Sequence, residues 1–71
     1  MKFIELTAIY YKDDSWKEAG KILVNPRHIV RISPNEINGL TVGCYIDTVN
    51  DHSGYSLKVK EKPEEIKEML R

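Results

Sequence analysis

Residues 55–71 read Tyr55-Ser56-Leu57-Lys58-Val59-Lys60-Glu61-Lys62-Pro63-Glu64-Glu65-Ile66-Lys67-Glu68-Met69-Leu70-Arg71, and the spacing of apolar residues changes within this stretch. Over residues 55–60 apolar and polar residues alternate, which predicts a β-strand with one wet face. From Pro63 onward the apolar residues Ile66, Met69 and Leu70 follow at i, i+3 and i+4, which predicts a helix. A helix of about nine residues is not stable alone in water, so we expect this stripe to dock on a sheet.

Four further apolar runs predict the rest of that sheet, at residues 3–11, 21–24, 28–33 and 43–49. In the first run Ile4, Leu6, Ala8 and Tyr10 share one face. Pro26 and Pro34, which lack an amide hydrogen, predict where the second and third strands end. We therefore expect an α+β fold, in which a small, strongly twisted, mostly antiparallel sheet of about five short strands carries one C-terminal helix. We expect a single domain over residues 1–71.

The connections between the strands differ in how well the sequence defines them. Residues 12–20 are charged and end in Gly20, which predicts a nine-residue loop that carries a helical turn or serves as a contact surface. Asn38-Gly39 favours a tight type I′ hairpin. The alternative there is a wider loop, because Pro34 and Gly43 interrupt the flanking strands. Residues 50–54 predict a further turn.

Length and composition limit how such a domain is stabilised. The chain has 71 residues, 11 basic against 11 acidic side chains, and one cysteine. A domain of this size buries only about 60% of the surface that its unfolded chain exposes, and one cysteine cannot form an internal disulfide. A partner chain is the remaining stabiliser. No apolar run approaches the ~20 residues that span a bilayer, and Glu5 interrupts any signal-peptide core, so we expect a cytoplasmic protein.

The residues that could carry catalysis or bind a metal do not fall into a known spacing. The candidate metal ligands are Cys44, His28, His52, Asp47 and Asp51, and they match no zinc or calcium motif. A Cys44–His28 or Cys44–His52 nucleophile pair would also need a pocket that so thin a core hardly encloses. The glycines are isolated and form no phosphate-binding loop. We predict a non-enzymatic protein with no catalytic, cofactor or metal site and no small-molecule substrate.

Nucleic-acid binding is the second-ranked hypothesis. Lys58, Lys60 and Lys62 alternate along the wet face of the last strand, and Arg27 and Arg31 could lie near them. Tyr45, Tyr55 or Trp16 could stack on bases. Against this hypothesis, acidic residues follow at once, and a neutral domain gains little from counterion release. Alternating lysines also protect edge strands from pairing with other sheets.

Protein–protein association ranks first. Phe3, Ile9, Tyr11 and Trp16 fall outside the expected core, and aromatic residues of this kind anchor interfaces. Tyr45 and Tyr55 fit either an interface or a curled core. The sequence thus predicts a small interaction or accessory module whose partner is a second copy or another protein.

The chain contains, in this order, five short segments: Glu5-Leu6-Thr7, Val24-Asn25-Pro26, Ile29-Val30-Arg31-Ile32-Ser33-Pro34, Val59-Lys60-Glu61 and Glu64-Glu65-Ile66. Together they resemble the FlbD family of small flagellar and swarming-motility proteins, and related short proteins of bacterial and phage-like genomes. The resemblance spans most of the chain. It implies a strand-rich domain with a short C-terminal helix and a role in motility or as a mobile-element or general accessory protein. It carries over no catalytic residue.

Overall fold

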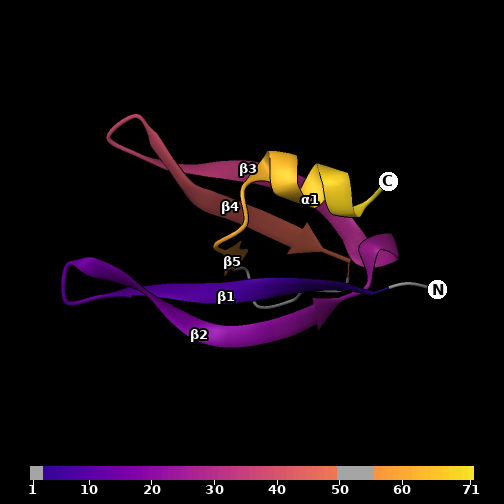
Figure 1. Ribbon diagram of the computed structural model, residues 1–71, viewed down its shortest axis with the longest axis horizontal. Helices are drawn as coiled ribbons and strands as arrows, with labels where there is room; N and C mark the ends of the chain where they lie inside the picture. The colour runs from indigo at the N-terminus through magenta and orange to yellow at the C-terminus, as the bar shows by residue number, and fades with distance from the viewer. Residues whose placement is uncertain (1–2, 50–55) are drawn as a thin grey trace.

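The computed structural model describes residues 3–49 and 56–71, which form five strands, a short 3-10 helix and one α-helix (Figure 1). The elements in chain order are β1 (Ile4–Lys12), β2 (Ser15–Val24), η1 (Pro26–His28), β3 (Ile29–Ile37), β4 (Leu40–Thr48), β5 (Leu57–Val59) and α1 (Pro63–Met69). The strands form one sheet in the order β2-β1-β5-β4-β3, and every pairing between them is antiparallel. The expected α+β class, with a five-stranded antiparallel sheet and a C-terminal helix, is confirmed.

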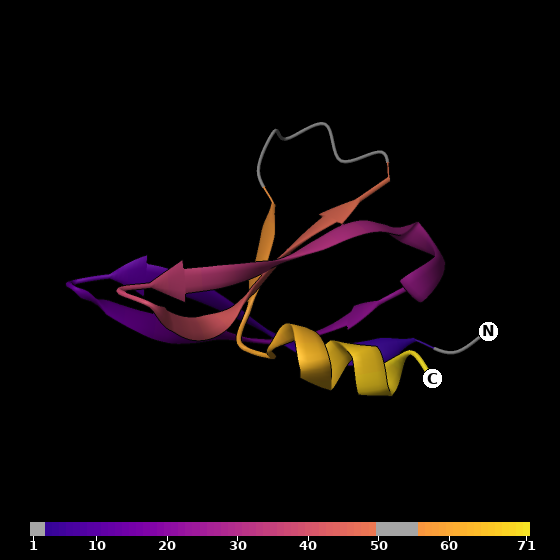
Figure 2. The same ribbon diagram turned by 90° about the horizontal axis from the view of Figure 1, so that it is seen from above.

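Two hairpins and a short bridging strand organise the molecule. The β1–β2 hairpin and the β3–β4 hairpin lie one below the other in Figure 1, with β5 between them. β5 pairs with β1 only at Ala8–Val59 but with β4 from Cys44 to Ile46. Seen from above, α1 lies along one side of the molecule, and both hairpin tips point away from it (Figure 2). The start of β1 therefore lies near the end of α1, opposite the hairpin tips.

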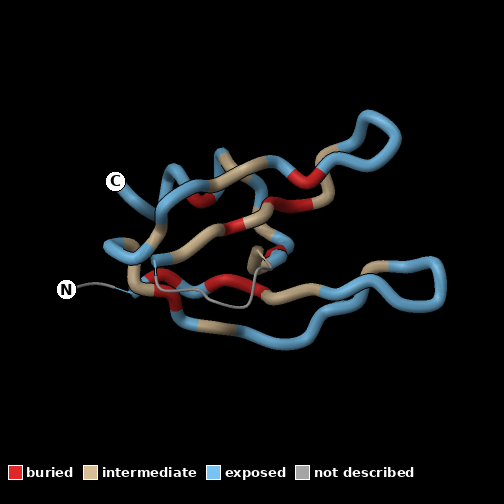
Figure 3. Tube along the Cα trace, turned by 180° about the vertical axis from the view of Figure 1, so that it is seen from behind, coloured by how far each residue is buried: buried red, intermediate tan, exposed pale blue. Residues whose placement is uncertain are grey.

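The core is small and lies where the hairpins, β5 and α1 meet. Within residues 3–49 and 56–71 the buried apolar side chains are Ile4, Leu6, Val24, Cys44, Ile46, Val59 and Ile66. Ile22, Ile29, Ile32 and Leu57 pack against them from the rim. Both hairpin tips are exposed (Figure 3). This distribution agrees with the thin core that the chain length predicts.

The predicted nine-residue loop at residues 12–20 is wrong. The chain turns within Asp13 and Asp14, whose φ angles of 53° and 61° are the positive values that a type I′ turn requires, and β2 begins at Ser15. Aspartate tolerates this left-handed conformation better than most residues, so no glycine is needed. The charges at residues 17–21 are those of an exposed strand, and Ala19 forms a bulge between Ala8–Gly20 and Ile9–Glu18.

The predicted strand end at Pro34 is also wrong, and so is the wider loop considered beyond it. β3 continues through Pro34, which pairs with Cys44, and ends at Ile37. The missing amide hydrogen is tolerated because β3 is an edge of the sheet. The tight hairpin at Asn38-Gly39 is confirmed, with φ angles of 52° and 81° and with Ile37 opposite Leu40.

The C-terminal part of the chain matches its prediction in type but not in extent. β5 is shorter than the strand predicted at residues 55–60, and Tyr55 and the turn expected at residues 50–54 lie outside the described residues. Within α1 only Ile66 is buried, and Met69 and Leu70 are 39% and 44% exposed. The helix thus docks through Ile66, whereas the rest of the predicted stripe is only partly covered. No helix within residues 3–49 and 56–71 has the length and apolar character needed to cross a membrane.

Candidate interaction surface

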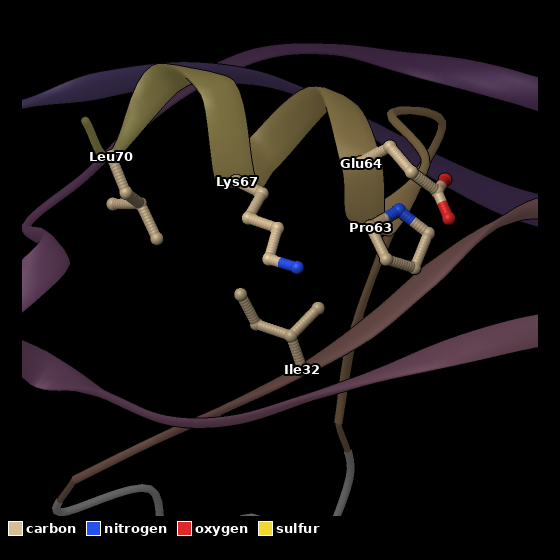
Figure 4. A pocket seen from close by; sticks show the side chains of 5 residues that line it. All are labelled: Ile32, Pro63, Glu64, Lys67 and Leu70. Carbon is tan, nitrogen blue, oxygen red and sulfur yellow. The ribbon is translucent and has the colours of Figure 1, made fainter.

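A mostly apolar groove lies between α1 and β3. It encloses about 250 Å³ and is lined by Ile32, Pro63, Glu64, Lys67 and Leu70. Figure 4 shows Ile32 pointing from β3 toward the helix, with Pro63, Lys67 and Leu70 on the helix side. The lining is mostly apolar, but Lys67 reaches across the groove, and its terminal nitrogen lies above Ile32 (Figure 4).

The apolar lining continues beyond this groove around the end of α1. Leu70 also lines a neighbouring hollow with Ile4, Pro26 and Met69, and Met69 and Ile4 line a third with Phe3. We call these seven side chains the α1 surface; its members are Phe3, Ile4, Pro26, Ile32, Pro63, Met69 and Leu70. Phe3 is 55% exposed. Exposed apolar side chains gathered in this way are typical of binding surfaces.

The local sequence explains how α1 comes to present this surface. The helix starts at Pro63, and the carboxylate of Glu65 accepts a hydrogen bond of 3.2 Å from the backbone amide of Lys62. Ile66, at the centre of the helix, is completely buried and anchors it. Met69 and Leu70 come one turn later, where the helix passes the rim of the core, so they stay half in solvent.

An aromatic pair lies near the tip of the β1–β2 hairpin. Tyr11 and Trp16 are cross-strand partners whose rings meet edge to face, with centroids 5.2 Å apart and planes at 67°. Tyr11 is 55% exposed, whereas Trp16 is half-buried, and its Nε1 is buried with no hydrogen-bond partner in the described part of the chain. Ile9 lies on the same strand face as Tyr11 and is half-buried.

The structure therefore separates the four predicted interface residues. Ile9, Tyr11 and Trp16 belong to the β1–β2 hairpin, and Phe3 belongs to the α1 surface. Phe3 and Tyr11 are eight residues apart along β1, which corresponds to about 27 Å. Sequence reasoning missed Met69, Leu70 and Ile32 as surface residues. No signal in the helical spacing distinguishes a stripe that is buried throughout from one that is buried at a single residue.

A polar network fastens the segment between β5 and α1 to β1. The Glu61 carboxylate accepts hydrogen bonds from the Thr7 amide at 2.8 Å and from Thr7 Oγ1 at 2.9 Å, and Lys21 Nζ donates to Thr7 Oγ1 at 2.8 Å. The amide of Lys60 donates to the Thr7 carbonyl. These bonds explain why Thr7, a polar residue, is only 2% exposed.

The five predicted nucleic-acid residues do not all lie together. Lys60 and Lys62 line one cleft of about 450 Å³, which Lys21, Glu61 and Glu65 also line. Lys60 pairs with Glu18 at 2.9 Å; the contact lowers the pKa of Glu18 and raises that of Lys60. Lys58 lies beside Tyr45 in the register of β5 and β4.

Arg27 is exposed in η1, and Arg31 lies at the β3 edge of the sheet. Arg31 pairs with Asp47 at 2.8 Å, and hydrogen bonds from Ser56 and from Arg31 lower the pKa of the Asp47 carboxyl. The two cations that face carboxylates, Lys60 and Arg31, are less available to phosphates.

Cys44 is a buried core residue on β4. It lies opposite Pro34 and Val59, whereas the exposed His28 lies beside Val49, so Cys44 and His28 are not neighbours. Burial raises the pKa of Cys44 to about 11, and the carboxylates of Glu61 and Glu65 add to the rise. Residues 3–49 and 56–71 contain no group of three or more His, Cys, Asp and Glu side chains arranged to hold a metal ion. His52 and Asp51 lie outside the described residues.

Comparison with known proteins gives no family model, no curated protein and no solved structure that matches this chain.

Proposed function

We propose that this chain is a non-enzymatic interaction module that self-associates and works by presenting an apolar surface. The observation that carries the proposal is its large accessible area. The area is 5338 Å², whereas a compact monomer of this mass is expected to expose about 4500 Å². The excess of about 800 Å² is similar in size to the area that one partner buries in a standard protein–protein interface, so the chain has surface available for a partner.

The shape of the molecule supports the same proposal. The radius of gyration is 12.0 Å, against about 11 Å expected for a compact chain of 71 residues. The difference comes from hairpins that extend beyond the core (Figure 1). Large apolar side chains are exposed at both ends of the molecule, including Phe3 and Leu70 at one end and Tyr10 and Leu40 toward the hairpin tips. Such side chains are stabilised by a partner.

Sedimentation equilibrium of the purified chain tests the proposal. We expect the average mass to rise from monomer toward dimer as the concentration increases from about 1 µM to about 1 mM, the range in which modest interfaces assemble. The transition should persist in high salt, because burial of apolar area drives it. A constant monomer mass over the whole range would overturn self-association.

The nucleic-acid alternative has weaker support, because Lys60 and Arg31 are engaged by Glu18 and Asp47. Lys58, exposed beside Tyr45, is the observation that favours it most. A motility or mobile-element role and a cytoplasmic location remain proposals that rest on the sequence.

A further inference from the structure

We propose that the α1 surface is the self-association interface and that α1 packs antiparallel against α1 of a second copy across a two-fold axis. This inference rests on the proposed function, since it names the partner and the contact surface of the same module. Its three supports are the apolar groove beside α1, the charge order along the helix and the apolar lining that continues from the groove to Phe3.

The groove offers a place for a side chain from another molecule. Pro63 and Leu70 stand at its two ends on the helix side, and Ile32 forms its β3 side (Figure 4). In an antiparallel pair related by a two-fold axis, the Leu70 end of one helix lies beside the Pro63 end of the other. Each Leu70, 44% exposed in the single chain, then enters the partner's groove, and both copies bury the same side chains.

The charges on α1 select the antiparallel orientation. Glu64 and Glu65 occupy the first turn, so the N-terminal end of α1 is acidic on balance despite Lys62. Toward the C-terminal end Lys67 and Arg71 outnumber Glu68, which lies 3.8 Å from Arg71, so that end is basic on balance. Antiparallel packing brings the acidic end of each helix next to the basic end of the other, whereas parallel packing would place like charges together. The surface is thus complementary to a copy of itself, and its apolar centre has a charged rim typical of interfaces.

The contact surface is larger than the helix. A helix of seven residues is only about 10 Å long and cannot supply about 800 Å² by itself. The α1 surface extends from Ile32 on β3 past Met69 to Phe3, so the neighbouring elements enlarge the contact on both sides of the helix.

Charge reversal at the two ends of α1 tests this arrangement in the full chain. Glu64→Lys leaves a helix with mainly basic ends, and Lys67→Glu with Arg71→Glu leaves an acidic helix. Each variant alone should dimerise at least about tenfold more weakly than the original chain, because like charges face each other twice. Mixed in equal amounts, the two variants should form a heterodimer at least as tight as the original homodimer. Sedimentation of each sample and of the mixture measures this.

Matched reversals on the exposed hairpins are the controls. Glu36→Lys on β3 matches Glu64→Lys, and Lys12→Glu with Lys17→Glu on the β1–β2 hairpin matches the double reversal. Both controls lie away from α1 and should leave dimerisation unchanged within about twofold. Circular dichroism confirms that each variant is folded. A loss of helix stability in the separate variants could not produce recovery on mixing, so recovery identifies contact between two α1 helices.

The remaining outcomes separate the two proposals. The α1 interface is wrong if the original chain dimerises but neither charge reversal weakens dimerisation. It is also wrong if the mixture dimerises as weakly as its two components. In both cases the chain self-associates through another surface. Equal weakening by the hairpin controls would also overturn the α1 interface. If the original chain is monomeric to about 1 mM, the proposed function itself fails.

Discussion

Gly43 lies on β4 where the backbone of β5 passes close to it. Its φ is +142°, and a Cβ atom added there would lie 2.0 Å from the backbone carbonyl oxygen of Val59. No side chain fits in this space, because a backbone oxygen cannot swing aside as a flexible side chain can. Gly43 therefore allows β5 to pair with β4 and places Val59 in the core.

Gly43→Ala should destabilise the protein by roughly 2 kcal/mol or more, since it adds a backbone clash to the strain of a positive φ. Gly20→Ala is the matched control. Gly20 has a similar φ of +128°, but a Cβ atom added there would meet no other atom within 4 Å. Urea unfolding followed by circular dichroism measures both variants. Equal losses at the two positions would mean that the clash with Val59 contributes nothing.

At the scale of elements, the two hairpins form turns with the same positive φ angles from different residues. Asn38-Gly39 is a favoured type I′ pair, whereas Asp13-Asp14 adopts two positive φ angles without a glycine and with two like charges side by side. This explains why the sequence predicted the second hairpin and missed the first. When turn residues only tolerate the left-handed conformation and do not prefer it, the sequence carries no distinctive signal for the turn.

Replacing Asp13-Asp14 by Asn-Gly should stabilise the protein by about 1 kcal/mol, because the new pair adopts the left-handed conformation more readily. For a domain of this size that corresponds to a rise in Tm of roughly 4–8 °C. The reverse change, Gly39→Asp in the other hairpin, should lower Tm. Thermal unfolding followed by circular dichroism checks both, and an unchanged Tm for the Asn-Gly variant would contradict a strained turn.

The position of β3 at the edge of the sheet explains why the strand continues through Pro34. Pro34 was predicted to end a strand, because proline cannot donate to a strand ladder. It is accommodated because β3 has a partner on one side only, and sequence alone does not reveal which strands become edges. The spacing rules thus predicted the type of every element in the described residues except the first half of β2 and the short η1, and they missed several boundaries.

At the scale of the whole molecule, Ile66 and Cys44 show how the core holds together. Ile66 closes the core from the helix side, and Cys44 lies within it on β4, both with no exposed surface. A thiol reagent can reach Cys44 only when the structure opens, so the labelling rate reports the population of open molecules. The rate also depends on ionisation, since the thiolate is the reactive form.

Ile66→Ala should cost roughly 3 kcal/mol, through lost burial and the cavity left behind. Labelling of Cys44 near neutral pH should therefore accelerate by about a hundredfold. Met69→Ala, on the same helix but 39% exposed, is the control and should change the rate much less. Similar acceleration in both variants would show that α1 docks through its whole stripe rather than through Ile66.

The pH dependence of stability has a defined sign at Cys44. Burial raises the pKa of Cys44 from 9.0 to about 11, so the folded chain holds this proton more tightly than the unfolded chain. The contribution of Cys44 to stability is complete below pH 9 and decreases as the pH rises toward 11. Cys44→Ala should remove this part of the alkaline loss, which urea unfolding at a series of pH values measures.

The sequence by itself determined the number and type of most elements, the Asn38-Gly39 turn and the small size of the core. These properties depend on local spacing and on chain length, which are written in the sequence. Only the tertiary structure decided that Met69 and Leu70 stay exposed, that Phe3 joins them and that Lys60 and Arg31 meet carboxylates. The physical reason is that exposure and ion pairing depend on where elements distant in the chain come to rest. Helical spacing defines a face of α1, but the packing of β1, β3 and η1 around it determines how much of that face is covered.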